Sequence, residues 1–175
     1  RPHDHRVAFA CLQELARDTA TMIAQGTQWQ KLSGLATITG DGVTEDWDLP
    51  EDFDWMPDGN QIWSTRIQTP LTKVMTQDEW LEKLIRLNSS VLNEWIIYGG
   101  QLHIRLALAS AEIAKYFYQS NNYVLSGSTP QANFTADTET FRLDERLLKL
   151  GMIWRWKADK GVPYGEHLED YETLK

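Results

Sequence analysis

The segment from Phe141 to Lys175 limits the fold of this chain most strongly, because it combines a long helical pattern, a helix stop and a second helix start. At about 100° per residue, the apolar residues of the first helical pattern fall on one narrow stripe. We expect this stripe to face the core of the protein. It consists of Leu143, Leu147, Leu150, Trp154 and Ala158, with Gly151 at its edge.

A second apolar ridge, made of Leu148, Met152 and Trp156, lies on the opposite side of the same helix among charged residues. A surface helix of a monomer usually has only one apolar stripe. Burying a methionine or tryptophan side chain contributes roughly 1.5–3 kcal/mol or more, so we expect the ridge to meet another surface. Two interpretations remain open: a second layer of the same domain, or a neighbouring subunit.

The pattern ends with residues that are typical of a helix C-terminus. Lys157 and Lys160 lie in the last turn, Gly161 is expected to be a left-handed cap, and Pro163 follows. A second helix is predicted to start within 164–166 and is still running where the sequence stops. Because the chain also begins with arginine rather than methionine, we expect a trimmed or processed chain.

The rest of the chain alternates between helix and strand patterns, which predicts an α+β fold. The expected elements are a helix over 4–25, a hairpin of strands 35–39 and 43–49, a strand over 61–68, a helix from Thr76 to about 88–90, a hairpin of strands 95–98 and 101–106, and a strand over 112–119, with loops at 120–122 and 126–130.

Several positions carry definite local expectations. Thr76 and Glu79 form a capping box, and Gly99–Gly100 supply the positive φ angles of a two-residue turn. Alternation along the following strand places His103 on the wet face. Cys11 is expected to be a small buried thiol. The helix after Thr76 is expected to bury an apolar face made of Trp80, Leu81, Leu84, Ile85 and Leu87, and the alternating strand to bury Leu102, Ile104 and Leu106.

Length and composition predict one soluble domain of 175 residues and argue against several functional classes. The net charge of −8 argues against direct binding to nucleic acid. No apolar run reaches the roughly 18 residues of a membrane span. The acidic residues between Glu45 and Asp58 lack the spacing of a calcium loop and predict a solvated rim, and His3 with His5 lacks further ligands, so no metal is expected.

No catalytic or cofactor motif is visible, so we expect neither an enzyme nor a bound cofactor. The sequence contains no G-x-S-x-G elbow, phosphate-binding loop, G-x-G-x-x-G or H-E-x-x-H pattern. An acid/base hydrolase stays open only because paired carboxylates are defined in space. A second alternative is a β-rich binding module for carbohydrate or protein, suggested by eight tryptophans, among them Trp47, Trp55 and Trp63.

The C-terminal segment resembles the head-to-tail adaptor (connector, or head-completion) proteins of tailed bacteriophages. Their pattern L-L-x-L-G-L-I-W-R-W-K, followed by K-G-L-D-Y-A-E-D-L-x-x-Y-E, is similar to 147–157 and 160–172, although 162–165 (VPYG) replaces L-D-Y-A and a further N-terminal helix is missing. Weaker similarities follow the family order along nearly the whole chain, at 29–32 (WQKL), 48–54 (DLPEDFD), 70–71 (PL), 77–80 (QDEW), 99–100 (GG) and 134–137 (FTAD).

This resemblance implies a single adaptor domain over 1–175, with a helical core at about 4–26 and 141–175 and a β-rich insertion with one helix at about 27–140. It implies a structural virion protein at the head–tail junction, assembled in the host cytoplasm as a ring of twelve copies beneath the portal protein. The ring would extend the DNA channel without binding DNA specifically and would dock the next tail or nozzle protein. The expected interface residues are Leu148, Met152, Arg155, Trp156, Tyr164, Leu168, Tyr171 and Leu174.

Overall fold

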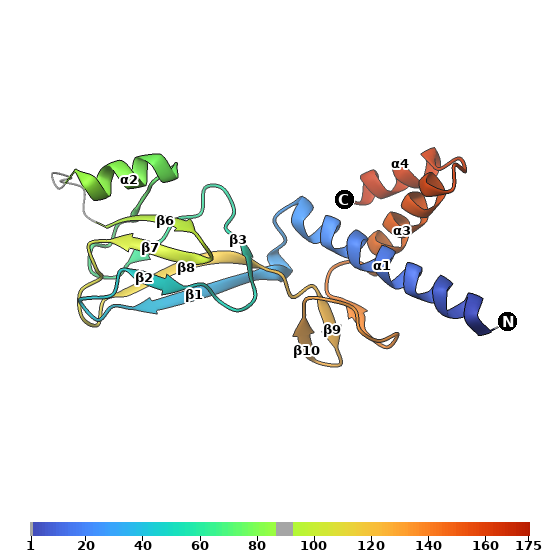
Figure 1. The fold of residues 1–175 in the computed structure, drawn as a ribbon, viewed down its shortest axis with the longest axis horizontal. Helices are drawn as coiled ribbons and strands as arrows, with labels where there is room; N and C mark the ends of the chain where they lie inside the picture. The colour runs from blue at the N-terminus through green and yellow to red at the C-terminus, as the bar shows by residue number, and fades with distance from the viewer. Residues whose placement is uncertain (1, 87–92) are drawn as a thin grey trace. The chain divides into compact units, whose positions relative to one another are not determined.

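The chain has an α+β fold in which N- and C-terminal helices flank a β-rich region, as the sequence predicts. A computed structural model describes residues 2–86 and 93–175, with side chains from residue 10 onward. The chain divides into two compact units (Figure 1). The helical unit comprises the chain up to Leu32 together with Ser120–Lys175, and the sheet unit comprises Ser33–Gln119.

The helical unit contains a long N-terminal helix, a C-terminal helical hairpin and a small sheet of strand order β10-β9-β11 (Figure 1). Residues 120–140, which the adaptor resemblance assigns to the insertion, lie in this unit. Its elements are α1 (Pro2–Gly26), η1 (Gln30–Leu32), β9 (Val124–Ser126), β10 (Thr129–Gln131), β11 (Thr140–Phe141), α3 (Glu145–Asp159) and α4 (Gly165–Leu174).

The helix ends of this unit follow local chemistry. The expected apolar stripe begins at Leu143, but α3 begins only after Asp144, because Asp144 is the N-cap and accepts hydrogen bonds from the Arg146 and Leu147 amides at 2.7 and 3.2 Å. Phe141 belongs to β11. Gly161 has a φ of +65°, which confirms the left-handed cap.

One side of α3 packs on α1 and α4 and forms the core of the helical unit. Gly151 lets α1 approach, since a Cβ there would lie 2.6 Å from Cγ2 of Thr19. Tyr171 of α4 is only 2% exposed and its ring lies 6.1 Å from that of Trp154. The buried apolar residues are Ala20, Ile23, Ala24, Leu32, Tyr123, Val124, Phe141, Leu143, Leu147 and Tyr171.

In its described residues, 33–86 and 93–119, the sheet unit has two four-stranded sheets and one helix. In the first sheet β8 pairs with β1, β3 and β4, and the second has the order β2-β7-β6-β5 with a parallel β5–β6 pair. The elements are β1 (Ser33–Thr39), β2 (Asp46–Asp48), β3 (Phe53–Trp55), β4 (Trp63–Ser64), β5 (Thr72–Lys73), α2 (Gln77–Ile85), β6 (Glu94–Tyr98), β7 (Gln101–Arg105) and β8 (Ile113–Ser120).

The β6–β7 hairpin is confirmed, with positive φ at both Gly99 and Gly100 and antiparallel pairing from Glu94↔Arg105 to Tyr98↔Gln101. The predicted hairpin between 35–39 and 43–49 is wrong. β1 pairs with β8 over its whole length, and β2 pairs with β7. The chain around Gly40 instead bonds to a distant turn, where the Gly40 amide donates to the Glu112 carbonyl at 2.7 Å.

Three other element predictions need correction. The expected loop at 126–130 is part of the β9–β10 hairpin. Within the expected strand at 61–68, only β4 (Trp63–Ser64) is a strand. Helix α2 ends at Ile85 rather than within 88–90, and Leu87 lies outside the described residues. Thr76 is the N-cap as predicted, accepting from the Glu79 amide at 3.1 Å, but the Glu79 carboxylate accepts from the Met75 amide instead of the Thr76 amide.

Two further side chains differ in burial from the sequence prediction. His103 is 8% exposed rather than solvated, because β2 covers β7 and brings Asp46 Oδ1 to 2.6 Å from its Nδ1, while the Tyr98 ring stacks on it at 3.9 Å. Cys11 is exposed rather than buried.

The acidic stretch is largely solvated, as predicted: five of its seven carboxylates are exposed and only Asp52 and Asp54 are half-buried. Three of these carboxylates also bond to the sheet. Asp46 contacts a buried histidine, Asp48 accepts from Gln101 at 3.0 Å, and Asp52 accepts from the Tyr118 hydroxyl at 2.6 Å. These carboxylates therefore attach the segment between β1 and β4 to the rest of the sheet unit. Within the described residues, no group of three acidic, histidine or cysteine side chains could hold a metal ion.

Candidate functional site

The ridge of Leu148, Met152 and Trp156 lines an open groove of about 580 Å³ in the helical unit. Both sides of the groove are largely apolar. α1 contributes Leu12 and Leu15, and the chain before α3 contributes Phe134 and Phe141, with Ile153 beside the ridge. Trp156 is 48% exposed, so a large apolar side chain of the ridge faces water. We call this surface the α1–α3 groove.

Contacts between α1 and α3 fix the wall of the groove. The Arg155 guanidinium donates to the Thr19 hydroxyl at 3.0 Å, and that hydroxyl donates to the Leu15 carbonyl one turn earlier at 2.6 Å. Arg155 also lies 3.9 Å from Asp18. Arg155, expected at a subunit interface, is therefore engaged within its own unit. Its contacts join the two helices that line the groove.

Charged side chains border the groove on several sides. Glu145, Lys149 and Lys157 project from α3, and Glu139 comes from the preceding loop. The Thr135 hydroxyl donates to Glu139 at 2.6 Å, and this hydrogen bond, with those from the Thr135 and Ala136 amides, lowers the pKa of Glu139 to about 2. The groove therefore has an apolar floor and a rim that carries both signs of charge.

Four of the expected interface residues belong to helix α4 and its N-cap, and they differ in burial. Tyr171 is buried against α3, and burial raises its pKa. Leu168 packs against the same core. Tyr164 and Leu174 remain exposed. The sequence predicts that all four residues lie on a binding surface. This prediction is wrong for Tyr171, because Tyr171 is buried in the core of its own unit.

The sheet unit carries a second exposed apolar surface, on the outer face of α2. The predicted burial of Leu81, Leu84 and Ile85 is wrong, because all three are exposed and only Trp80 of this helix is buried. Ile85 is 71% exposed. The sequence pattern identified these residues as apolar, but it assigned them to the core because a helix of this kind normally turns such a face inward.

A third exposed apolar set lies on the first sheet. Leu35 of β1 is directly opposite Phe117 of β8, and both side chains are exposed together with Trp63 of β4. The other two tryptophans proposed for a binding platform are Trp47 and Trp55, and the indole nitrogens of both are shielded from solvent. Only one of the three tryptophans therefore presents an exposed ring.

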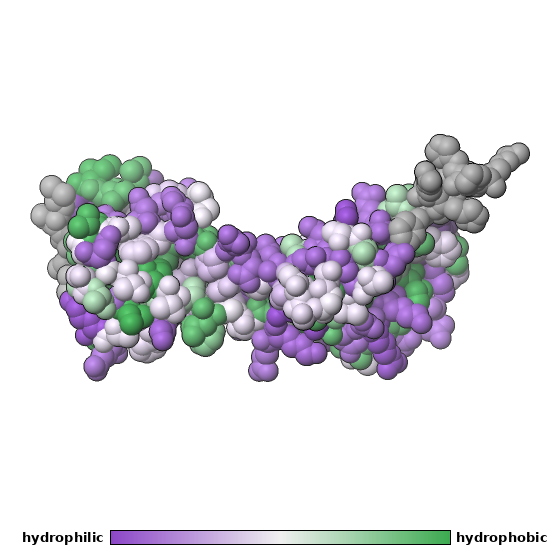
Figure 2. All heavy atoms as spheres, turned by 90° about the horizontal axis from the view of Figure 1, so that it is seen from below, coloured by the Kyte–Doolittle hydropathy of each residue, from purple (hydrophilic) through white to green (hydrophobic). Residues whose placement is uncertain are grey.

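The apolar groove contrasts with the surface that Figure 2 shows, where hydrophilic residues cover most of the face and apolar residues form small separate patches. Such a distribution is ordinary for a protein surface. A mainly apolar groove is a less common surface feature, which makes it a candidate site of interaction.

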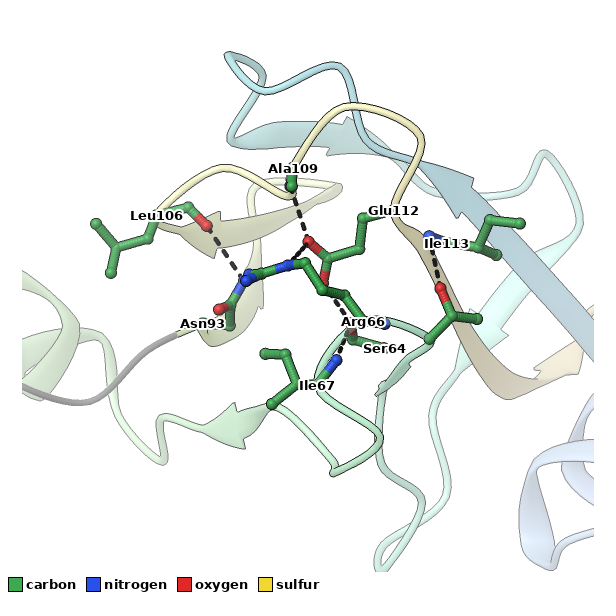
Figure 3. A network of polar contacts seen from close by, with 9 residues as sticks. Ser64, Arg66, Ile67, Asn93, Leu106, Ala109, Glu112 and Ile113 are labelled. Atoms are coloured by element: carbon green, nitrogen blue, oxygen red, sulfur yellow. Dashed lines mark hydrogen bonds and ion pairs between the residues drawn. The ribbon is translucent and has the colours of Figure 1, made fainter.

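The sheet unit also contains a buried carboxylate, Glu112. The Ser64 hydroxyl, Arg66 Nε at 2.7 Å and the Ala109 amide at 2.8 Å all donate to it (Figure 3). Burial raises the pKa of Glu112, but the hydrogen bonds from Ser64 and Arg66 together lower the pKa by a larger amount. The pKa of Glu112 therefore lies below its ordinary value. A general acid or base works best with a pKa near the operating pH. We assign Glu112 a structural role, joining β4 to the turn before β8.

Glu94 is a second buried carboxylate, and it attaches α2 to the sheet. Lys83 of α2 and Arg105 of β7 both form ion pairs with it. The hydrogen bond to Glu94 is the main cause of the raised pKa of Lys83. Trp80 adds apolar packing against Val74 and Ile96. These contacts fix the orientation of α2, with its apolar residues on the outside.

None of the described helices is long and apolar enough to cross a membrane. No protein-family model matches the chain, and no curated protein matches it significantly.

Proposed function

We propose that this chain is a structural head-to-tail adaptor of a tailed bacteriophage, which forms a ring beneath the portal and extends the DNA channel. The observation that carries the proposal is the apolar ridge of Leu148, Met152 and Trp156 in the open α1–α3 groove. The ridge belongs to the helix whose sequence resembles the adaptor family. No catalysis is part of the proposed role.

The exposure of Trp156 favours a neighbouring subunit over a second layer of the same core for this end of the ridge, whereas Leu148 at the other end packs against the core of the unit. The opposite side of α3 already buries Leu147 and the surface of Gly151, whereas Trp156 remains half exposed. Covering an apolar side chain contributes roughly 1.5–3 kcal/mol. In a ring every copy gains this contribution, because the same contact repeats around the symmetry axis.

The charge of the chain supports the channel role. A net charge of −8 repels the phosphate backbone, so DNA can pass a ring of such subunits without being held. Specific DNA binding would require clusters of basic residues on the surface. The exposed α4 residues Tyr164 and Leu174 are the proposed contacts to the portal or to the next tail component.

The oligomeric state and portal binding test this proposal. Native mass spectrometry and negative-stain microscopy of the full chain are expected to show a closed ring that associates with purified portal rings. The double variant Met152→Ala/Trp156→Ala is expected to lose the ring while keeping most of its thermal stability. Leu147→Ala is the matched control on the buried side of α3 and is expected to lose about 2–5 kcal/mol of stability. A chain that stays monomeric and binds no portal ring would overturn the proposal.

A binding module of a phage tail or tail fibre is a second candidate, favoured by the exposed ring of Trp63 beside Phe117 and Leu35. Aromatic side chains on a flat sheet face can stack on sugar rings or on a protein partner. Glycan-array binding that disappears in Trp63→Ala would support this candidate. Trp47→Ala is the comparison at a largely buried tryptophan, where loss of binding would accompany loss of folding.

A further inference from the structure

Strand β1 forms an open edge of the first sheet in the sheet unit. β1 and β8 run side by side and pair over all of β1 (Figure 1), whereas β3 and β4 pair with the other side of β8. Among the described strands, β1 pairs with β8 alone. One side of β1 therefore has no strand beside it.

The backbone amides and carbonyls of alternate β1 residues point to this open edge. Ile113 of β8 directs its own backbone groups toward β4, because its carbonyl accepts from the Thr65 amide at 2.9 Å and its amide donates to the Thr65 hydroxyl at 3.1 Å. Its partner Thr39 is therefore in a non-hydrogen-bonded pair and points its N–H and C=O away from β8. The two-residue period gives the same direction to Leu35 and Thr37, whose side chains are also exposed.

β1 lacks the features that normally protect an edge strand. Its seven residues (SGLATIT) include no charge and no proline, and its register with β8 is continuous. The other edge strands in the described part of the chain have two or three residues, and β2 (DWD), β5 (TK) and β10 (TPQ) also carry charge or proline. A long, uncharged edge strand is a template for pairing with another strand.

We propose that β1 pairs antiparallel with β1 of a second copy about a two-fold axis at Ala36. This inference goes beyond the adaptor role and does not use the α1–α3 groove. In this register all seven residues of the two strands overlap. The outward-pointing residues face each other, so that Leu35 and Thr37 of one copy form hydrogen-bonded pairs with Thr37 and Leu35 of the second copy. The contact closes after two copies, because a two-fold interface uses the same surface on both.

The composition of β1 favours a second copy as its partner. Because β1 is uncharged, two copies meet without like-charge repulsion. At the axis, a non-hydrogen-bonded pair brings the two Cα atoms to about 4.5 Å, and the small side chain of Ala36 allows this approach. On the exposed face, Leu35 becomes a diagonal neighbour of Leu35 in the second copy. A single copy leaves this leucine 53% exposed beside Phe117, so the pairing covers apolar surface that one copy cannot cover.

The molar mass of two edge variants tests the pairing. Both are made in the full chain carrying Met152→Ala/Trp156→Ala, which removes the ridge contact of the proposed ring. In sedimentation equilibrium this parent chain is expected to be a dimer with twice the chain mass of 20.2 kDa.

The two variants differ in one backbone N–H. Thr37→Pro removes an N–H that points away from β8, and proline is tolerated at such edge positions. The two-fold axis removes this hydrogen bond twice, so the dissociation constant of the dimer is expected to rise by about tenfold or more. Thr37→Val keeps the N–H and the shape of the side chain, and it is expected to leave the dimer intact.

A disulfide between copies tests the register without weakening the sheet. With Cys11→Ser removing the exposed native thiol, a chain carrying Leu35→Cys is mixed with one carrying Thr37→Cys. The Cα atoms of a hydrogen-bonded antiparallel pair lie about 5.5 Å apart, which a disulfide can span. Oxidation is therefore expected to give a cross-linked heterodimer. Phe117→Cys in place of Thr37→Cys is the control, because Phe117 is as exposed but lies on β8, and it is expected to give no heterodimer.

The outcomes separate this inference from the adaptor proposal. A Thr37→Pro chain that keeps its circular dichroism spectrum and dimerises as tightly as Thr37→Val would overturn the pairing of β1. If Thr37→Pro unfolds, the cross-link decides, and a mixture without cross-linked heterodimer overturns the pairing. A monomeric parent chain, as expected if β1 instead receives a strand of another protein, would also overturn it. A β1 dimer whose wild-type chain binds no portal ring would leave this inference standing and overturn the adaptor proposal.

Discussion

Replacing Gly151 with alanine is expected to destabilise the helical unit, although alanine is the better helix former. A Cβ on Gly151 would lie 2.6 Å from Cγ2 of Thr19 and 3.3 Å from a ring carbon of Tyr171, and both neighbours are buried. Thr19 cannot turn away without losing bonds, since its hydroxyl donates to the Leu15 carbonyl at 2.6 Å and accepts from Arg155 at 3.0 Å.

Two opposing contributions set the size of the effect. Alanine is favoured over glycine in a helix interior by about 1 kcal/mol. Forcing an extra methyl group into a well-packed core costs typically about 1–3 kcal/mol. Because two hydrogen bonds of the Thr19 hydroxyl hold its side chain in place, we place the packing cost in the upper part of that range. The expected result is a net loss of about 1–2 kcal/mol in the free energy of unfolding.

Urea unfolding of the full chain, followed by far-ultraviolet circular dichroism, measures this loss. Thr19→Ser removes the obstructing methyl group and keeps the hydroxyl, so Gly151→Ala is expected to cost little in that background. The double-mutant cycle should then give a coupling of about 1–2 kcal/mol. Gly165→Ala, where nothing lies within 4 Å of the added Cβ, is the control and should be neutral or slightly stabilising. A Gly151→Ala chain as stable as wild type, or a coupling near zero, would refute the reasoning.

Three further predictions concern stability. Tyr171→Ala should lower the free energy of unfolding by about 3–5 kcal/mol in urea titrations. Leu174→Ala, at an exposed residue of the same helix, should change the free energy of unfolding by less than about 1 kcal/mol. Similar losses in the two variants would contradict the assignment of Tyr171 to the core. Thr76→Ala should cost about 1 kcal/mol through loss of the α2 cap, and Thr76→Ser should restore most of it. The pKa of Glu139 falls from 4.5 to about 2 on folding. The contribution of Glu139 to the free energy of unfolding is therefore complete above pH 4.5 and is lost as the pH falls from 4.5 to 2. Melting curves of Glu139→Gln should therefore depend less on pH in that window than wild-type curves, and equal pH dependence would show that the Thr135 contact has no effect.

The helices and the β6–β7 hairpin could be predicted because the chemistry that sets them is local. Gly161, Asp144 and Thr76 act on amides or carbonyls within a few residues, and two adjacent glycines set the turn between β6 and β7. Apolar spacing did not give the start of α3, because the stripe already includes Leu143, whereas the side chain of Asp144 determines where the helix begins.

The strand partners could not be predicted, because pairing depends on residues distant in sequence. β1 is followed by a glycine-rich turn that suggests a hairpin, but the turn binds the chain near Glu112 and β1 pairs with β8. The burial of His103 has the same origin. Alternation along β7 gives the direction of its side chain, and only the pairing with β2 shows that Asp46 covers it.

Part of the candidate site was visible in the sequence, because helical spacing fixes which residues share a face. Leu148, Met152 and Trp156 form a ridge in any α-helix, and the structure adds that Leu12 and Leu15 of α1 face them across an open groove. Arg155 and Tyr171 share the same segment but serve the packing of the unit. Spacing alone could not separate them from the ridge, since both depend on how closely α1 and α4 approach α3.

Helices α2 and α3 show why apolar periodicity predicts a face but not its partner. In α2 the covered side is narrow, because Trp80 fills the apolar contact and Lys83 reaches buried Glu94 beside it. The remaining apolar residues have no place in the sheet unit and stay outside. In α3, Arg155 binds Thr19 of α1, and Trp156 of the ridge stays half exposed. In both helices a charged side chain anchors one side while apolar residues on another side remain exposed. Removing the anchor with Lys83→Met should therefore loosen α2, and faster hydrogen exchange of its amides would detect this. Unchanged exchange would contradict the anchoring role of the ion pair with Glu94.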